Sequence, residues 1–317
     1  MLRILTFALL LVSGSALAQT SQKTIQILVP FAPGASSDGI SRIIANELAP
    51  RLSRQIVVEN KPGAGGSLGL MTLAKAAPDG ETLGVGATGA LVISPHLAGA
   101  PPFDPLRELA PIAKLIDVPL VIVANPAVGP KSIKEMIERS KATPGGITFG
   151  STGTNSGQHL TMELLKKVTG ANLVHVAYRG SAPAVTDLVG GQIPLAVVDL
   201  TSAHPHIKAG TLIALAVPHM HRTAMAPEIP TVAEAGVLGF GRIGGFIGMF
   251  GPAGTPAPLV KRLSQEVGAI LAVPQVQDKV RLLSVEPGYT DDVAFARMLA
   301  EESAKWKELL QSMPMPN

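Results

Sequence analysis

Three short turns of the sequence combine glycine, alanine, serine, threonine and asparagine with few bulky side chains. They are FAPGASSD (31–38), GATGAL (86–91) and GSTGTNSGQH (150–159). At least the first and third follow strand-like runs and precede runs with helical spacing. Backbone N–H groups and hydroxyls at the start of a helix can bind an anion without a fixed positive charge. Helix capping explains any one such turn, since serine, threonine and asparagine cap helices widely, but three together favour a binding site.

The elements that must position these turns alternate along the chain between strand-like and helix-like runs. The helix after residue 38 carries Ile40, Ile44 and Leu48 on one face, and the last helix is expected at about 291–311. Such alternation predicts an α/β fold with largely parallel sheets, in which ligands bind at the carboxyl ends of strands. The predicted strands lie within residues 24–31, 55–60, 81–88, 119–126, 146–152, 172–178, 193–199, 212–217 and 246–252.

Composition excludes several other classes of protein. Of the 317 residues 46% are hydrophobic and 15% are charged, which is typical of a chain with a sizeable core. The net charge of +3 is too small to indicate a nucleic-acid partner. Aromatic residues make up only 3%, which disfavours sites that stack sugars or bases, and the absence of cysteine excludes disulfides and thiolate chemistry.

The N-terminus has the pattern of an export signal. Arg3 precedes an apolar run from Ile4 to Val12, and small residues then end at Ala18 in an A-x-A cleavage site. The run is too short to span a membrane, and a buried N-terminal helix is the alternative reading. We therefore expect residues 1–18 to be removed, a mature chain starting at Gln19, and a periplasmic or secreted location.

Catalytic and metal-binding patterns are weaker. GAGGSLG (63–69) departs from the dinucleotide fingerprint, and no phosphate loop or G-x-S-x-G elbow is present. The pairs His204/His206 and His219/His221 lack an evident acidic third ligand, so surface loops are favoured over a metal site. His159 could act as a base, but no nucleophile can be assigned to it. No cofactor or metal is predicted.

The chain resembles the Bug-type solute-binding proteins, the extracytoplasmic receptors of tripartite tricarboxylate transporters. The resemblance rests on residues 24–83 together with the later blocks GSTGTNSGQHLTMELL, VAYRGSAPAVTDLVGGQIPLAVVD, IKAGTLIALAV, IPTVAEAG and GPAGTPAPLVKRL, which occur in the family's order. It covers essentially all of the mature chain.

This resemblance implies a two-lobed type II periplasmic-binding-protein fold with a ligand cleft between the lobes. The expected first lobe comprises residues 19–124 and 226–317, and the second comprises residues 125–225. A carboxylated ligand is expected in the cleft, held by backbone and hydroxyl groups of both lobes. The positions that match the family's ligand-binding loops are Phe31, Gly34, Ala35, Ser36, Ser37, Asp38, Thr88, Gly89, Ala90, Ser151, Thr154, Asn155, His159 and Asp199.

Two positions depart from the family's pattern. Ala35 and Asn155 stand where the family usually has glycine, and asparagine tolerates a left-handed backbone better than alanine does. Asp38 differs from the other expected ligand residues, because a carboxylate in the first turn of a helix would repel an anion. It either caps the helix or receives an ammonium or hydroxyl group of the ligand.

The sequence therefore predicts a monomeric receptor for a small carboxylate, without catalysis and without a nucleic-acid partner. Its partners would be inner-membrane transporter subunits. One alternative is a sensor that presents its liganded form to a membrane signalling protein. A further alternative is an exported hydrolase or lyase that uses His159 and the serine-rich loop.

Overall fold

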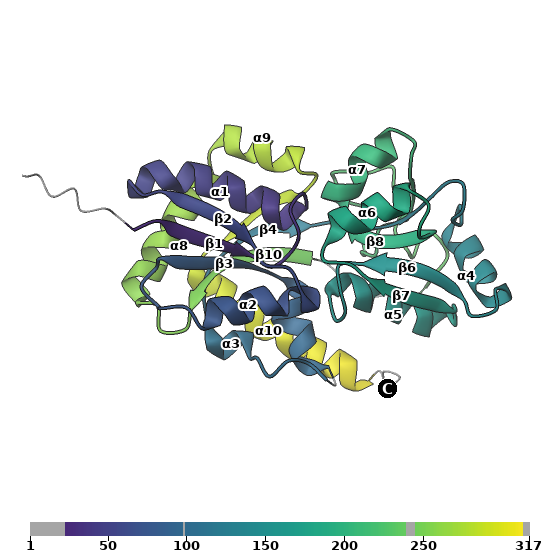
Figure 1. Ribbon diagram of the computed structural model, residues 1–317, viewed down its shortest axis with the longest axis horizontal. Helices are drawn as coiled ribbons and strands as arrows, with labels where there is room; N and C mark the ends of the chain where they lie inside the picture. Colours follow the sequence, from purple (N-terminus) through teal and green to yellow (C-terminus); the bar gives the residue numbers. More distant parts are fainter. Residues whose placement is uncertain (1–22, 98, 239–244, 313–317) are drawn as a thin grey trace, which may run out of the picture.

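Two separate β-sheets, each covered by helices, form two lobes that lie side by side (Figure 1). The structure is a computed structural model that describes residues 23–97, 99–238 and 245–312. The predicted leader and the predicted mature N-terminus at Gln19 lie outside these ranges. Within them, no helix is both long enough and apolar enough to cross a membrane. The two-lobed α/β class predicted from the sequence is confirmed.

The first lobe is built on a six-stranded mixed sheet. Its strands are β1 (Ile25–Val29), β2 (Ile56–Asn60), β3 (Thr82–Ala87), β4 (Leu109–Val118), β10 (Gly245–Pro252) and β11 (Glu286–Thr290). They lie in the order β11-β4-β10-β3-β1-β2. β1 is parallel to β2 and β3, whereas β10 is antiparallel to β3 and β4. The helical segments of this lobe are α1 (Ser36–Leu52), η1 (Ala64–Gly66), α2 (Ser67–Ala74), η2 (Gly89–Ile93), η3 (Ser94–His96), α3 (Pro105–Glu108), α8 (Ala257–Leu271), α9 (Pro274–Leu282) and α10 (Asp292–Ser312).

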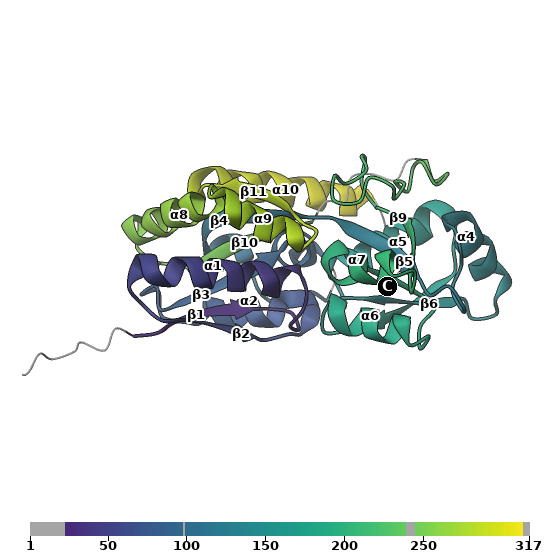
Figure 2. The same ribbon diagram turned by 90° about the horizontal axis from the view of Figure 1, so that it is seen from above.

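Alternation along β1 explains why helices cover both faces of this sheet. Ile25, Ile27 and Val29 belong to a buried cluster with Ile40 and other residues of α1, α8 and α9. Leu28 points the other way, into a second cluster formed with α2, η2 and α10. Successive side chains of a strand face opposite sides, so a strand with buried apolar side chains on both faces requires cover on both sides. Figure 2 shows the helices α1, α8, α9 and α10 from above.

The second lobe is built on a five-stranded sheet. Its strands are β5 (Leu120–Ala124), β6 (Ile147–Ser151), β7 (Leu173–Ala177), β8 (Leu195–Asp199) and β9 (Ile213–Ala216), in the order β7-β6-β8-β5-β9. β6 is parallel to β7 and β8, whereas β5 is antiparallel to β8 and β9. Its helices are α4 (Ile133–Ala142), α5 (Gly157–Thr169), α6 (Ser181–Val189) and α7 (Leu200–Lys208).

All nine strand-like runs of the sequence form strands, but β4 and β11 were not predicted. The burial of β4 does not alternate, and it contains Pro111, Lys114 and Asp117, so it lacks the pattern of a strand. β11, with the sequence EPGYT, is an edge strand, where proline and glycine are tolerated. The expectation of largely parallel sheets was wrong, because five of the nine strand pairings among the described residues are antiparallel.

The chain changes lobes at different places from those expected. It crosses first at Pro119, between β4 and β5, so residues 120–124 belong to the second sheet although they were assigned to the first lobe. After β9, Val232 N–H donates to Val217 O, and Ala226 and Ile229 pack with β5 and β8. The return therefore comes after residue 232 and not at 226. Sheet membership depends on partner strands, which a strand's own sequence does not reveal.

Candidate functional site

A small cavity of about 40 Å³ lies where the two lobes meet. The first lobe contributes the start of α1, the end of β3 and the start of η2. The second contributes the starts of α5 and α6 and the end of β8. The segments that connect the lobes complete the wall. The lining residues are Phe31, Ala35, Ser36, Ser37, Ala87, Thr88, Gly89, Ile93, Val118, Leu120, Thr152, Gly157, Gln158, Ser181, Asp199, Gly245, Phe246 and Ile247.

The start of α1 contacts the second lobe directly. Ala35 is the N-cap residue and offers no side-chain cap, so the first N–H groups of the helix look outward for acceptors. Asp199 supplies one: its Oδ2 accepts from Ser36 N at 3.0 Å and from Ser36 Oγ at 2.6 Å. A carboxylate of the protein thus already occupies part of the anion-binding end of this helix.

Asp199 itself ends β8 and caps α7. Its Oδ1 accepts a hydrogen bond from Ser202 N at 3.3 Å, and its own N–H donates to Ser181 Oγ at 3.1 Å. Only 3% of the residue is exposed. The carboxylate is therefore held between the starts of two helices, one from each lobe.

The start of α5 supplies the second-lobe wall. Asn155 adopts a left-handed backbone with φ of 62°, so it takes the conformation that the family's glycine would take there. Ser156 then caps the helix by accepting from His159 N at 3.2 Å. Thr152 Oγ donates to Gln158 Oε1 at 2.9 Å, which leaves the NH₂ group of Gln158 as a donor beside the cavity.

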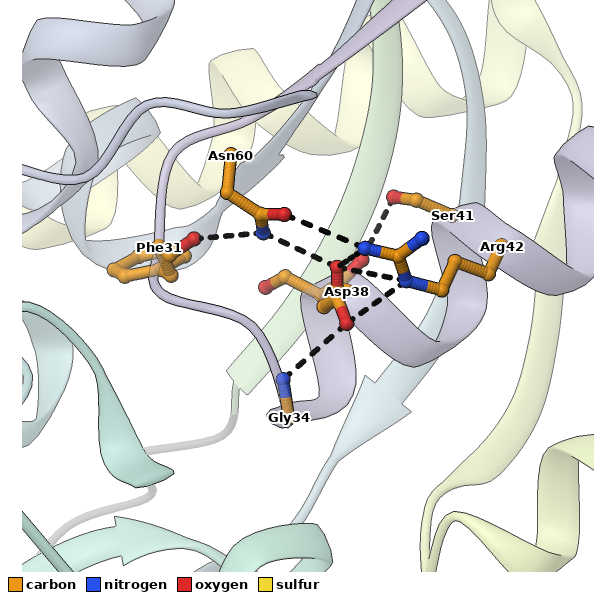
Figure 3. A network of polar contacts seen from close by, with 7 residues as sticks. Phe31, Gly34, Asp38, Ser41, Arg42 and Asn60 are labelled. Carbon is orange, nitrogen blue, oxygen red and sulfur yellow. Dashed lines mark hydrogen bonds and ion pairs between the residues drawn. The ribbon is translucent and has the colours of Figure 1, made fainter. Parts of the chain in front are cut away.

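Asp38 supports the first turn of α1 from outside the cavity (Figure 3). Its carboxylate accepts from Gly34 N, from Asn60 Nδ2 and from the guanidinium of Arg42. Burial alone would raise the pKa of Asp38, but these hydrogen bonds outweigh burial and hold the pKa below its ordinary value. Asn60 also donates to Phe31 O, so one network ties the turn at 31–38 to β2.

The Asp38 network changes the roles expected for two residues. The N–H of Gly34 faces Asp38 at 3.2 Å and does not face the cavity. Asp38 forms its hydrogen bonds within and beside the turn and does not line the cavity, so this arrangement favours the structural role of its two expected roles. The φ of 91° at Gly34 explains the need for glycine at this position.

His159 lies behind the second-lobe turn, stacked on His175 with ring centroids 3.9 Å apart. Its Nδ1 accepts from Asn155 N at 3.2 Å, which fixes the turn. Burial and, to a lesser extent, Lys166 lower the pKa of His159 to about 4. Burial together with the neighbouring His159 also lowers the pKa of His175 to about 4. Both rings are therefore neutral at pH 7.

Ser151 contacts His175, and not His159 as the catalytic alternative would require. Ser151 Oγ and His175 Nε2 are 2.6 Å apart, but the serine is fully buried and neither residue lines the cavity. The contact between Ser151 and His175 therefore supports the turn at 150–159.

Seven of the fourteen predicted site residues line the cavity and seven do not. Those that line it are Phe31, Ala35, Ser36, Ser37, Thr88, Gly89 and Asp199. Gly34, Asp38, Ser151 and His159 shape the turns from behind. Ala90 is buried in the first-lobe core, Thr154 is exposed, and Asn155 positions α5 by its backbone.

Sequence reasoning missed eleven lining residues. Thr152, Gly157 and Gln158 lie within the small-residue turn 150–159, so their position in the sequence is itself a signal for them. Ser181 begins α6 after the sequence YRG, which is another strand-to-helix turn. Val118, Leu120 and residues 245–247 lie at the ends of β4, β5 and β10, and only the fold brings them to the cavity.

The four histidines considered as metal ligands lie apart from this cavity. His204 Nδ1 is 2.7 Å from Ser284 Oγ of the first lobe, in a contact between lobes. His219 and His221 contact each other in an exposed turn. In the part of the chain that the structure describes, no group of three potential ligands is arranged to hold a metal ion.

A cavity between two α/β lobes, with helix N-termini from both lobes at its wall, is typical of a two-lobed binding protein. The chain belongs to the TctC family, the tripartite tricarboxylate transporter family receptors, whose profile matches residues 40–315. The Bug-type resemblance and the periplasmic-binding-protein fold are thereby confirmed.

Similar proteins support the same family. The chain is 33% identical over 285 residues to the protein BugT of Bordetella pertussis, covering 90% of this chain and 87% of BugT. The structure of the periplasmic binding protein BugD is similar with a TM-score of 0.86 and 32% identity, covering 93% of this chain and 98% of that one. The structure of MatC from Rhodopseudomonas palustris with bound malate has a TM-score of 0.84 and 30% identity, covering 90% and 98%.

Proposed function

We propose that this receptor captures a small carboxylate in the periplasm and presents it to inner-membrane subunits of a tripartite transporter. The observation that carries the proposal is the wall of the cavity between the lobes. It gathers the starts of α1, α5 and α6 with the hydroxyls of Ser36, Ser37, Thr88, Thr152 and Ser181.

The chemistry of this wall suits a carboxylate. Backbone N–H groups at helix starts and hydroxyls are hydrogen-bond donors that stabilise a negative charge without a counter-ion. Among the lining residues that the structure describes there is no lysine, arginine or histidine. The relative MatC, whose structure contains malate, offers a precedent for a small acid in this family.

Entry of a ligand requires the lobes to separate. A volume of about 40 Å³ has room for roughly three water molecules, at about 10–15 Å³ each, and not for a four-carbon acid. Contacts such as Ser36–Asp199 also bridge the lobes directly. We therefore infer that the lobes open around the connecting segments to admit the ligand, and that they close on it around a cavity larger than about 40 Å³.

The periplasmic location and the transporter partner rest on the family and on the predicted leader. TctC is described as a receptor of a transporter, and the related BugD is described as a periplasmic binding protein. Arg3, the apolar run to Val12 and the A-x-A site at Ala18 agree with export.

A thermal-shift panel tests the ligand class. Mono-, di- and tricarboxylates, amino acids, sugars and simple amines are added to the purified protein. A ligand at a hundredfold excess over its dissociation constant stabilises the folded state by about 2.7 kcal/mol. For a chain of this size that corresponds to a rise in midpoint of roughly 5–11 °C, expected only for carboxylates. A sugar or amine that gives this rise while every carboxylate has no effect would overturn the proposal, and turnover of a panel member would favour an enzyme.

A further inference from the structure

Within the described part of the cavity wall, Asp199 is the one acidic residue, and no basic residue lines the cavity beside it. Its carboxylate accepts from Ser36 N, Ser36 Oγ and Ser202 N, and all three donors are uncharged. With 3% exposure it is screened little by water. The cavity therefore contains a negative charge that a ligand must accommodate.

The hydrogen-bonding capacity of Asp199 is not exhausted. A carboxylate has about four acceptor sites. Ser36 takes two of them at Oδ2, while the bond from Ser202 N to Oδ1 is long, at 3.3 Å. At least one acceptor site on Oδ1 remains for a donor that enters the cavity.

The uncharged donors of the second lobe lie beside this carboxylate. Gln158 and Gly157 begin α5, which follows β6, and β6 is the direct neighbour of β8, which ends in Asp199. Neighbouring strands are about 4.8 Å apart, so a ligand carboxylate at the start of α5 would lie close to Asp199. A second carboxylate pointing toward Asp199 would be repelled, whereas a hydroxyl or ammonium group would be held.

We propose that Asp199 determines specificity by selecting carboxylates that carry a hydrogen-bond donor, a hydroxyl or an ammonium group, next to the carboxylate. This inference rests on the proposed function and narrows its ligand class to 2-hydroxy and 2-amino acids. In this arrangement the α5 side binds the carboxylate of the ligand and Asp199 accepts from the substituent on the adjacent carbon.

Matched sets of ligands test the selection in the wild-type protein. Each set shares a carbon skeleton and differs in one substituent, hydrogen, hydroxyl or ammonium. The sets are propionate, lactate and alanine; succinate, malate and aspartate; and 3-phenylpropionate, phenyllactate and phenylalanine. Calorimetry at pH 7.5 should show, in the set that binds, at least about tenfold tighter binding of the substituted members, since a hydrogen bond to a charged group is worth a factor of this order.

The variant Asp199→Asn tests whether Asp199 causes the preference. It keeps the size of the side chain and an oxygen acceptor for Ser36 but removes the charge. The preference for the substituted members should fall below about threefold, with the ammonium member losing most. Asp278→Asn, which removes the same charge from an exposed residue of α9, is the matched control and should keep the wild-type preference.

The outcomes separate this inference from the proposed function. A wild-type protein that binds the unsubstituted acid as tightly as its hydroxyl and amino analogues would overturn the inference and leave the carboxylate receptor standing. An unchanged preference in Asp199→Asn would also overturn it. A wild-type protein that binds no member of any set, while a non-carboxylate binds, would overturn the proposed function and the inference together. The comparison of ligands on the wild-type protein needs no variant, so it still tests the inference if Asp199→Asn does not fold.

Discussion

Asp38 and Asp199 have the same side chain, and both were predicted as ligand residues, yet their surroundings differ. The guanidinium of Arg42 and the amide of Asn60 face the carboxylate of Asp38, which stabilises the turn at 31–38. Asp199 has only uncharged donors and lines the cavity. The charge of Asp38 is therefore balanced by Arg42 within one lobe, while the described hydrogen-bond donors to Asp199 are uncharged.

The stacked pair His159 and His175 should make stability depend on pH. Burial lowers both pKa values to about 4, from an ordinary value of 6.5. The unfolded chain therefore binds these protons first, so the stabilisation is complete above pH 6.5 and is lost as the pH falls from 6.5 through 4. Lys166 opposes protonation of both rings, whereas Glu163 favours protonation of His175 and only partly offsets the loss.

Denaturant titrations between pH 6 and pH 4.5 measure this loss. Each histidine that takes up a proton only on unfolding contributes a slope of about 1.4 kcal/mol per pH unit to the free energy of unfolding. His175→Gln should lower the total slope by about that amount. Equal slopes in wild type and His175→Gln would mean that His175 is not neutral in the folded protein.

At the scale of elements, the turns require small residues for a second reason, besides access for a ligand. A Cβ atom on Gly89, at the start of η2, would lie 2.3 Å from the backbone N of Gly157 in α5. A Cβ on Gly65 in η1 would lie 2.5 Å from Thr154 O. Real Cβ atoms do not approach backbone this closely, so these glycines let the turns of the two lobes meet.

The variant Gly89→Ala should hinder closure without unfolding either lobe. Its methyl group would collide with the backbone of α5, so the lobes would stop short of the closed position. The affinity for a carboxylate should fall at least about tenfold. The displaced second lobe would lose hydrogen bonds to the ligand, and a factor of this order corresponds to the free energy of one or two such bonds. Calorimetry measures the affinity, and circular dichroism checks the fold.

Gly190→Ala is the matched control for Gly89→Ala. A Cβ at Gly190 meets only atoms of its own lobe at 3.4 Å or more, so affinity should stay within about twofold of wild type. Wild-type affinity in Gly89→Ala would show that ligand binding does not require the close approach of η2 and α5.

For the whole molecule, contacts between the lobes extend well beyond the cavity. Ala32 N–H donates to Arg179 O at 2.9 Å on one side. On the other side Thr201 Oγ donates to Leu283 O, and His204 contacts Ser284. The lobes are thus joined by contacts outside the cavity as well as at its wall.

A disulfide between the lobes should lock the cavity shut. A Cβ on Gly34 would lie 3.4 Å from Cβ of Ala182 in α6, close to the roughly 3.5–4.5 Å of disulfides. The natural chain has no cysteine, so Gly34→Cys with Ala182→Cys would form the only pair. The oxidised protein should bind a carboxylate at least about a hundredfold more slowly than the reduced protein, because entry requires opening.

Stopped-flow measurements compare the two redox states of the same double variant. The reduced form is the control, since it carries the same substitutions and the same strain at Gly34, where φ is 91°. Association at equal rates in both states would show that the ligand reaches the cavity without separation of the lobes.

The sequence by itself determined the local elements and the family. Nine apolar runs became strands because their burial is encoded in their own residues, and the small polar turns lie at helix starts as expected. The family's blocks in order were enough to identify the receptor class. Half of the predicted site residues also line the cavity, because helix starts after strands meet at one edge of a sheet.

Only the tertiary structure decided which side chains face the cavity and where the lobes begin and end. β4 and β11 are stabilised by their neighbours and not by their own pattern, and β5 joined the second sheet through pairing with β8 and β9. Whether the charge of an aspartate is balanced within its own lobe or faces the cavity depends on residues far away in the chain. Ser36 and Asp199, for example, are separated by 163 positions. Contacts over such distances are set by packing between lobes, which no local sequence pattern records.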